Sequence, residues 1–395
     1  MHALRTDVAH NVRRDIIRLC HQGLDWVTLA RRATERIGRV VPHESSCWHT
    51  IDPATLLLTG SFVQQLADGG FPLFTQCEYA REDVNKWSFL AQCHWPVGIL
   101  TRVTHGDRDQ SVRFRELLYP QGIEWELRAS LVSDSLCWGA LGFYRHRGEP
   151  DFNDREAAFV ASIAVVLADG FRRALLVNAV VTDDAPDGPG LILLDDRNGV
   201  DSISPAAERW LDELVNAGDV MVDRLPHPIY AVADRTRTAA DRQDRPALQA
   251  RARVHTRSGR WLVLHGTRLN GAAEGKIGVI IEPAHPLEIA PLMTEAYGLS
   301  DRERKVTQLV LQGLSTNGIA EELYISPHTV QDHLKTIFEK VGVSSRRELV
   351  ARIFSVHYRP HVLEGVVPGS DGAFAVRQDS PRVTRRNHQI AIAGS

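Results

Sequence analysis

The segment from Leu299 to Phe354 constrains the fold of this 395-residue chain more than any other stretch. Its helix start and stop residues predict four short helices, because serine recurs where a helix can begin and glycine where one can end. Ser300 and Glu303 form a capping box, in which the serine hydroxyl accepts from the third helical amide and the glutamate accepts from the amide of the serine. Gly313 is expected to end this first helix, since glycine adopts a positive φ without strain.

A tight turn separates the second and third predicted helices. Ser315 caps the second, and Ser326 followed by Pro327 opens the third, because proline already has the φ angle of a first helical residue. Ser345 and Glu348 repeat the capping box for the fourth helix. Two helices joined by such a turn, the second with a polar outer face, are the arrangement that places side chains in the major groove of DNA.

The whole segment resembles the LuxR-type helix-turn-helix of bacterial transcriptional regulators. The residues that stand where this family has them are Glu303, Gly313, Ser315, Ile319, Ala320, Leu323, Ser326, Thr329, Val330, His333, Lys340, Val343, Arg347 and Leu349. The resemblance implies an all-α four-helix domain at residues 292–357 that binds double-stranded DNA. The chain departs from the family at Gln331, where lysine is usual, and Asp332 follows it. The groove-facing side is therefore less basic than in most members.

One face of the third predicted helix carries the side chains expected to read the bases. In a helix that starts at Pro327, the residues left facing outward are His328, Gln331, Asp332 and Lys335. The resemblance implies that the positions of the last three approach the bases. Glutamine can pair with adenine through two hydrogen bonds and aspartate can accept one from cytosine, so this face is expected to select the DNA sequence.

A second group of residues is expected to hold the DNA backbone: Thr316, Asn317, Thr329, Arg346 and Arg347. Thr316 and Asn317 begin the second predicted helix, whose first amides favour phosphate. Thr329 and the two arginines border the same surface. Phosphate contacts position a protein on DNA without reading its sequence, so these residues are expected to affect affinity more than specificity.

Charge divides the chain into two unequal parts. The net charge of −3 does not by itself indicate a nucleic-acid binder. Residues 1–297 carry 33 Lys/Arg against 39 Asp/Glu, whereas residues 298–395 carry 13 against 10. The positive excess therefore lies at the end that would contact phosphate.

Residues 1–181 have the element order of an α+β domain, namely helix, antiparallel sheet and closing helix. Residues 6–38 predict one or two helices, and short strands follow as a hairpin from Ser46. The clearest sheet signal is a second hairpin, Trp125–Val132 and Cys137–Arg145, whose alternation of apolar and polar residues predicts one buried face.

Helices are expected between and after these hairpins. Two helical stretches are predicted at Cys77–Leu90 and Asp107–Leu118, the second opened by Asp107 and Gln110 as a cap pair. A long apolar helix follows the second hairpin and runs to about Val177, capped by the stretch Phe152-Asn153-Asp154-Arg155-Glu156. With this closing helix, the region from about residue 10 to residue 177 is similar to a GAF-type sensor domain. The alternative is a generic α+β domain without a ligand pocket.

Residues 190–283 predict a second α+β domain, which follows a polar, Pro/Gly-rich linker at residues 182–190. Two strands come first, then a helix capped by Ser204 and a further helical stretch after Pro228. Three strands complete the unit, at residues 248–256, 260–268 and 276–282. This order resembles that of a PAS domain.

Two further segments connect or extend the predicted domains. Ala284–Pro291 lies in a stretch with prolines at 283, 286 and 291, which predicts a semi-rigid spacer. Residues 359–395 have scattered Gly, Pro, Ser and Arg without periodicity, which is typical of a disordered tail.

We find no catalytic or metal-binding constellation in the sequence. His43-Glu44 begins a zinc-protease pattern, but Cys47 stands where its second histidine should be. Other neighbouring Cys and His residues are isolated, and such pairs are more often core packing than metal sites. The five cysteines have irregular spacings, which indicates a reduced, cytoplasmic chain, and no apolar run is long enough to cross a membrane.

Two classes of function stay open at this point. The first is a one-component transcriptional regulator, in which the N-terminal domains sense a small molecule or a redox signal and the C-terminal domain binds DNA. The second is a small-molecule-processing enzyme that uses the C-terminal segment for oligomerisation. The completeness of the pattern at residues 299–354 favours the regulator, which is not an enzyme. Its expected partners are double-stranded DNA, an unidentified small-molecule effector and RNA polymerase, with no membrane association.

A homodimer is expected, because one helix-turn-helix reads only a half-site and a two-fold dimer reads two. The fourth predicted helix offers Leu349, Val350 and Ile353 as an apolar side for this pairing. The alternative is that these three residues complete the core of the monomer.

Overall fold

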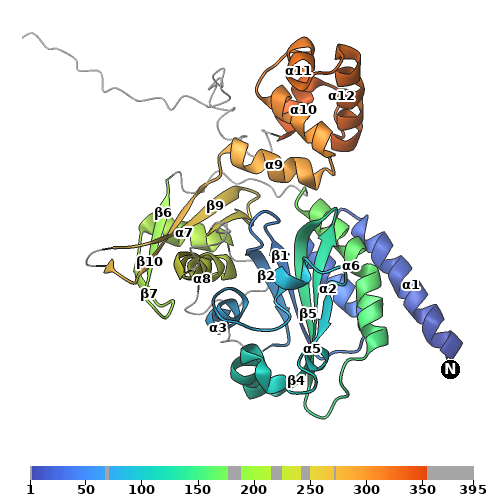
Figure 1. The fold of residues 1–395 in the computed structure, drawn as a ribbon, viewed down its shortest axis with the longest axis vertical. Coiled ribbons are helices and arrows are strands. Elements are labelled where there is room, and N and C mark those ends of the chain that lie inside the picture. The colour runs from blue at the N-terminus through green and yellow to red at the C-terminus, as the bar shows by residue number, and fades with distance from the viewer. Residues whose placement is uncertain are drawn as a thin grey trace, which may run out of the picture.

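The computed structural model describes residues 2–66, 71–176, 188–214, 225–241, 250–270 and 273–353, and these form two antiparallel sheets followed by a helical domain (Figure 1). We call residues 2–176 the first sheet unit and residues 188–283 the second sheet unit. Both sheets have five strands in the same order: counted along the chain, the second strand lies at one edge, followed by the first, fifth, fourth and third.

The first sheet unit contains the predicted N-terminal helices and both predicted hairpins. Its main elements are α1 (His2–Cys20), α2 (Trp26–Ile37), β1 (Ser45–Ile51), β2 (Leu58–Gln64), β3 (Val97–Ile99), β4 (Ile123–Ser133), β5 (Leu136–His146) and α6 (Asp154–Ala174). Asn153 caps α6 as predicted, and Glu156 completes a capping box with it. The hairpins meet where β1 pairs with β5, so long-range strand pairing forms the middle of the sheet.

One face of the first sheet is covered by α1, α2 and α6 (Figure 1). Trp48 of β1 stacks on Phe171 of α6 with ring centroids 5.9 Å apart, and Trp48 also meets Phe143 edge-on at 6.0 Å. These aromatic side chains are buried in one apolar cluster with Leu127 of β4. Such a cluster anchors the closing helix to the sheet.

The opposite face of the first sheet is also buried, so the prediction of a single buried face was wrong. Short segments cover it: α3 (Phe71–Thr75), α4 (Trp87–Leu90) and π-helical turns at Gln76–Ala80 and Phe114–Leu118. Beneath them lie the polar residues of β4 that alternation assigns to solvent, namely Glu126, Arg128 and Ser130. A polar face can be buried when its side chains bond to one another and to the segments above.

The helical stretches predicted at Cys77–Leu90 and Asp107–Leu118 are broken into short turns, α5 (Leu100–Val103) preceding the second of them. The cap pair was wrong, because the carboxylate of Asp107 accepts from Gln110 Nε2 at 3.2 Å instead of from a backbone amide. β3 was not predicted, since three residues are too few to show a period.

The second sheet unit follows the predicted order of two strands, helices and three strands. Its elements are β6 (Gly190–Leu194), β7 (Val200–Ile203), α7 (Pro205–Leu214), α8 (His227–Asp241), β8 (Arg251–His255), β9 (Trp261–Arg268) and β10 (Ile277–Pro283). Ser204 caps α7 through a bond from the amide of Ala207 at 3.3 Å. The predicted linker lies outside the described residues up to residue 187. α8 lies between the units, because it contacts β9 and β10 on one side and β2 and α3 on the other.

A buried ion pair joins the two units. Asp52, in the turn after β1, accepts from Arg253 of β8 through both carboxylate oxygens, at 2.6 and 2.9 Å. The backbone amide of Arg253 donates to the same carboxylate at 3.0 Å, and its guanidinium reaches the carbonyl of Glu288 at 3.3 Å. Charge-assisted bonds of this fork geometry fix orientation, so the pair holds both units and the following helix in one arrangement.

The predicted spacer is a helix, α9 (Pro286–Ala296), which corrects the sequence prediction. Proline is tolerated in the first turn of a helix, and Pro291 is accommodated inside it. Ile289, Leu292, Met293 and Ala296 recur at helical spacing and are buried against the first sheet unit. Burial of this apolar face stabilises the helix by more than its prolines destabilise it.

The C-terminal domain consists of α10 (Asp301–Leu311), α11 (Thr316–Leu323), α12 (Pro327–Val341) and a helical segment at residues 346–353. The capping box of Ser300 and Glu303 is confirmed, with the Ser300 amide 2.7 Å from Glu303 Oε2. At the last segment Ser345 accepts from the Glu348 amide as predicted, but the Glu348 carboxylate accepts from the amide of Ser344 rather than from that of Ser345.

The apolar side proposed for dimerisation lies in the monomer core, which is a further correction. Leu349 is fully buried, Ile353 is 2% exposed, and Val350 packs on the same cluster. The segment 346–353 therefore completes the small core of the four-helix domain. The tail at residues 359–395 lies outside the described residues. Among the described helices, none combines the length and the apolar character needed to span a bilayer.

Candidate nucleic-acid interface and buried cavity

α11 and α12 meet through the predicted tight turn. Ser315 Oγ accepts from the Gly318 amide at 3.1 Å, and Ser326 Oγ accepts from the Thr329 amide at 3.0 Å, so both helices begin at the predicted caps. Tyr324 between them has a φ of 53°, the left-handed conformation that reverses the chain after α11. The turn also accepts a 2.8 Å bond from Arg302 of α10 at the carbonyl of Leu323, a contact that the sequence did not indicate.

His328 and the three residues assigned to base readout share the outer face of α12. His328, Gln331, Asp332 and Lys335 are all exposed, whereas Val330, Leu334 and Ile337 on the inner face are buried. His328 Nδ1 lies 3.1 Å from Asp332 Oδ2, and the two side chains are 84% and 68% exposed. A pair this exposed is free to exchange its partner for a base, because exposed ion pairs contribute little to stability.

The residues assigned to the DNA backbone gather at the neighbouring end of the domain. Arg346 donates to the carbonyl of Leu314, which lies just before the N-terminus of α11. This bond brings the start of the last helical segment next to Thr316 and Asn317. Partial burial lowers the pKa of Arg346, while the neighbouring Arg347 stays exposed. Arg346 therefore contributes to the stability of the domain through its bond to Leu314 and is only partly exposed.

The hydroxyl of Thr329, the remaining residue of this group, is 2.9 Å from Ser326 Oγ within the cap of α12. Lys340, a residue of the family pattern, is also used internally, since its Nζ lies 2.7 Å from Glu303 Oε2. Burial opposes ionisation of Glu303, but the bonds from Lys340 and Ser300 outweigh it and lower the pKa of this carboxyl. Asn317 and Arg347 are thus the most accessible of the predicted phosphate ligands.

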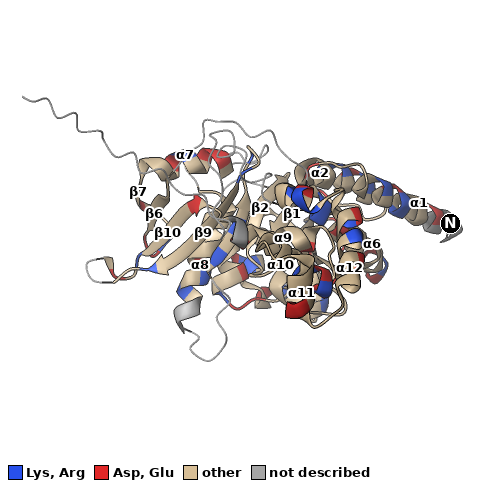
Figure 2. Ribbon diagram, turned by 90° about the horizontal axis from the view of Figure 1, so that it is seen from above, with Lys and Arg blue, Asp and Glu red and all other residues tan. Residues whose placement is uncertain are grey.

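Charge on the interface is mixed rather than uniformly positive. α12 carries Lys335 and Lys340 together with Asp332 and Glu339, and both signs are visible among the C-terminal helices (Figure 2). Long-range attraction to DNA is correspondingly modest, so specific contacts must supply much of the affinity.

A second candidate site lies in the first sheet unit, where α8 of the second unit borders a small, partly open cavity of about 40 Å³. The side chains that line it are mostly apolar: Cys47, His49, Val63, Leu66, Phe74, Leu117, Leu118, Gln121, Tyr144 and His227. His227 is the only one of these described lining residues that comes from the second unit. Sequence reasoning missed the cavity, because its walls come from strands and turns far apart in the chain.

Two histidines face each other across this cavity, with ring centroids 5.9 Å apart. Burial lowers the pKa of His227 to about 3. Burial, and then the proximity of His227, hold the pKa of His49 well below its usual value. Both rings are therefore neutral at pH 7. His49 Nδ1 lies 2.6 Å from Ser61 Oγ, and the ring stacks on Phe74 with centroids 5.4 Å apart.

Cys47 lines the same cavity, but its thiol is not poised for redox chemistry. Its Sγ lies 3.2 Å from the hydroxyl of Tyr144, and burial raises the pKa of the thiol to about 11. Thiolate rather than thiol is the reactive form of cysteine. The cavity therefore suits ligand binding better than oxidation.

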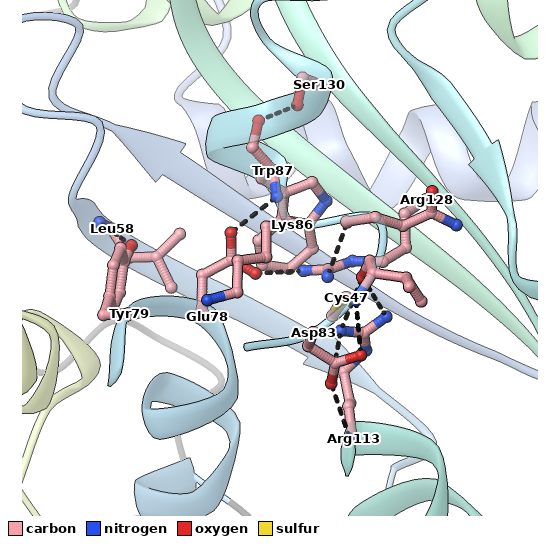
Figure 3. Close-up of polar contacts among 12 residues, drawn as sticks. Cys47, Leu58, Glu78, Tyr79, Asp83, Lys86, Trp87, Arg113, Arg128 and Ser130 are labelled. Carbon is pink, nitrogen blue, oxygen red and sulfur yellow. Dashed lines mark hydrogen bonds and ion pairs between the residues drawn. The ribbon is translucent and has the colours of Figure 1, made fainter. Parts of the chain in front are cut away.

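A buried charge network stabilises the segment around Trp87, next to this cavity (Figure 3). Its members are Glu78, Asp83, Arg113, Glu126 and Arg128. Arg113 Nη2 lies 2.7 Å from Glu126 Oε2, and Arg128 Nη2 lies 2.9 Å from Glu78 Oε2. The other oxygen of Glu78 accepts from the Trp87 amide at 2.6 Å. Since Trp87 packs on His49 at 4.7 Å, the network fixes the segment that holds this histidine.

Comparison with known proteins supports the C-terminal assignment. Residues 298–353 match the model of the family described as bacterial regulatory proteins, luxR family. The matched region is 48% identical over 52 residues to an HTH-type transcriptional regulator of Mycobacterium bovis, covering 13% of this chain and 6% of that protein. It is 43% identical over 61 residues to the transcriptional regulatory protein DesR of Bacillus subtilis, covering 15% and 31%. The chain thus spans less than a third of the length of these relatives.

Among solved structures, this chain is similar to the GAF domain/HD domain protein from Geobacter sulfurreducens. The aligned region covers 37% of this chain and 91% of that one. The identity is 17% and the TM-score is 0.29, a score that does not establish a shared fold. The C-terminal segment, by contrast, is a LuxR-family helix-turn-helix domain on the strength of its family match.

Proposed function

From this LuxR-family helix-turn-helix domain, we propose that the chain is a transcriptional regulator that binds double-stranded DNA with α12 in the major groove. The observation that carries the proposal is the outer face of α12, where His328, Gln331, Asp332 and Lys335 are exposed together. In this arrangement Gln331, Asp332 and Lys335 reach the bases. Thr316, Asn317, Thr329, Arg346 and Arg347 border the DNA backbone.

The two sheet units are proposed to be sensors that control this binding. We assign residues 1–181 to a GAF-like domain, residues 190–283 to a PAS-like domain and residues 292–357 to the DNA-binding domain. The shared strand order supports related α+β sensors, and the small, mostly apolar cavity supports a small-molecule effector rather than a redox signal. α9 connects the sensors to the DNA-binding domain.

The regulator is proposed to act in the cytoplasm as a homodimer on two half-sites, with RNA polymerase as a further partner. Since Leu349 and Ile353 are buried in the monomer, these two side chains are not available for the dimer surface.

Selection of binding sites from random double-stranded DNA tests the proposal. The purified full-length chain should enrich a sequence with two related half-sites about 10 base pairs apart, or a multiple of that spacing. A variant with Gln331, Asp332 and Lys335 changed to alanine should enrich none. Failure of the unmodified chain to enrich any sequence, or equal enrichment by the variant, would contradict the proposed role of α12.

A further inference from the structure

The cavity between β1 and α8 presents hydrogen-bonding atoms that nothing in the described part of the chain satisfies. His49 is 1% exposed, and its Nε2 has no hydrogen-bond partner among the described residues. Oε1 of Gln121, which lines the same cavity, is likewise buried without a partner there. Leaving such atoms unpaired is costly, so they are expected to meet a ligand or water.

The surroundings of these atoms exclude a charged ligand. None of the described residues lining the cavity is Asp, Glu, Lys or Arg, and seven are Val, Leu, Phe, Tyr or Cys. Transfer of an unpaired ion into such surroundings is far more costly than transfer of a neutral polar group. A metal ion also lacks support, because the described residues contain no group of three or more His, Cys, Asp or Glu placed to hold one.

Size limits the ligand further. A water molecule occupies roughly 10–15 Å³ on the scale by which this cavity measures about 40 Å³, so the cavity as it stands has room for about three to four atoms of that size. A hydroxyl or a carboxamide both donates and accepts hydrogen bonds. It can therefore satisfy His49 in either tautomer and Gln121 in either orientation of its amide.

We infer that this cavity takes a small uncharged ligand that bears a hydroxyl or carboxamide group, which bonds to His49 and Gln121 while α8 of the second sheet unit encloses it. This inference rests on the proposed sensor function and names its ligand class. Because His227 closes the cavity from α8, ligand binding is coupled to the docking of the two units. The Asp52–Arg253 pair beside β1 links the docking of the two units to α9, because Arg253 also donates to the carbonyl of Glu288 in that helix.

Acetamide and acetate are matched probes, since they have the same number of non-hydrogen atoms and differ in charge. We expect acetamide to shift the Nε2 resonance of His49 saturably in the full-length protein labelled with ¹⁵N in its histidine rings. The signal is assigned as the one lost in His49→Phe. The efficiency limit for very small ligands sets a dissociation constant no tighter than about 0.05 mM. Acetate should bind at least about tenfold more weakly, and a Gln121→Leu variant should lose most of the acetamide affinity.

Benzamide tests whether α8 forms the wall. It is too large for the cavity as it stands, but His227→Ala removes a ring from the α8 side and should allow it to bind at least about tenfold more tightly. His255→Ala is the matched control, because His255 is a histidine of the second sheet unit outside this cavity. If His227→Ala does not fold, Leu117→Ala enlarges the same cavity from the first unit.

Three results would overturn the inference: equal binding of acetate and acetamide, an unchanged His49 signal at saturating acetamide, or equal gain of benzamide binding in His255→Ala. Selection of DNA sites on the same preparation is an independent measurement. A protein that enriches a DNA site but ignores acetamide refutes the ligand class and leaves the regulator intact. One that binds acetamide but no DNA refutes the regulator and leaves the cavity assignment.

Discussion

Two rows of polar side chains, one on β4 and one on α12, illustrate how a similar sequence pattern has two different outcomes. On β4 the row of Glu126, Arg128 and Ser130 is buried under short helical turns, with Glu126 and Arg128 paired in the charge network and Ser130 donating to the carbonyl of Trp87. On α12 the row of His328, Gln331, Asp332 and Lys335 stays exposed, because no other described segment covers that face. The buried row determines stability and the exposed row is available to a partner. Changes in the first should therefore weaken folding, and changes in the second should weaken recognition.

The largest effect is expected from Arg128→Ala in the buried row. Removing this guanidinium leaves Glu78 buried without its ion-pair partner, which costs about 3–5 kcal/mol of unfolding free energy. It also removes the contact of Arg128 with the ring of Trp87 at 3.7 Å. Urea unfolding followed by hydrogen exchange of the first sheet unit measures the loss. Arg102→Ala is the control, because Arg102 pairs with Asp154 at an exposed position of the same unit and should cost less than about 1 kcal/mol. Equal costs would show that the network on β4 has no special role.

Gln331→Ala in the exposed row should leave the unfolding free energy nearly unchanged and relax the choice of base at one position of the DNA site. A good contact from glutamine to adenine discriminates by about 1–3 kcal/mol. Fluorescence anisotropy against the selected site and its single-base variants measures the change. A uniform loss of affinity for all sequences would show that Gln331 does not read a base.

The buried histidines should make stability depend on pH. The native pKa of His227 is lowered to about 3, and that of His49 also lies well below the usual 6.5. Between these native values and pH 6.5 the unfolded chain binds more protons than the native one, so stability is present above pH 6.5 and is lost as the pH falls towards 3. Each ring contributes at most about 1.4 kcal/mol per pH unit. Unfolding at several pH values should therefore show a shallower slope for His227→Gln. An unchanged slope would mean that this ring is not buried in the folded protein.

The smallest effect is expected from Arg347→Ala, which removes an exposed charge beside α11. Loss of one phosphate contact should reduce the slope of log affinity against log salt by up to about 0.9. Arg346→Ala should have a similar effect on the slope but should also lower the thermal midpoint, because Arg346 donates to the carbonyl of Leu314. An unchanged slope in both variants would assign these arginines to ordinary surface.

The sequence was most informative where local chemistry decides the structure. Caps at Asn153, Ser300, Ser315 and Ser326 were predicted correctly, because a cap depends on residues only a few positions apart. The prolines of α9 indicated a spacer, although the apolar residues from Ile289 to Ala296 recur at helical spacing, so this helix was not predicted.

Features that depend on distant segments were beyond the reach of such patterns. The burial of Glu126 and Arg128 depends on turns around Glu78 and Arg113. The cavity depends on α8, which lies far from β1 in the chain. No local period records which segment will cover a given face. The assignment of bases and phosphates to particular side chains stays a prediction, although the structure leaves six of the nine chosen residues exposed.

The apolar face of α9 fixes the orientation of the C-terminal domain relative to the first sheet unit. Ile289, Leu292, Met293 and Ala296 fix one side of this helix on the first sheet unit, and Lys340 Nζ bonds at 3.2 Å to the carbonyl of Gly298 just beyond it. A helix turns by about 100° and advances by about 1.5 Å per residue. One residue inserted into α9 after Ala296 would therefore rotate the reading helix by more than a quarter turn about the axis of α9. Four inserted residues would nearly restore its direction and displace it by about 6 Å. In the proposed mode of DNA binding, the length of α9 therefore matters as much as the residues of α12.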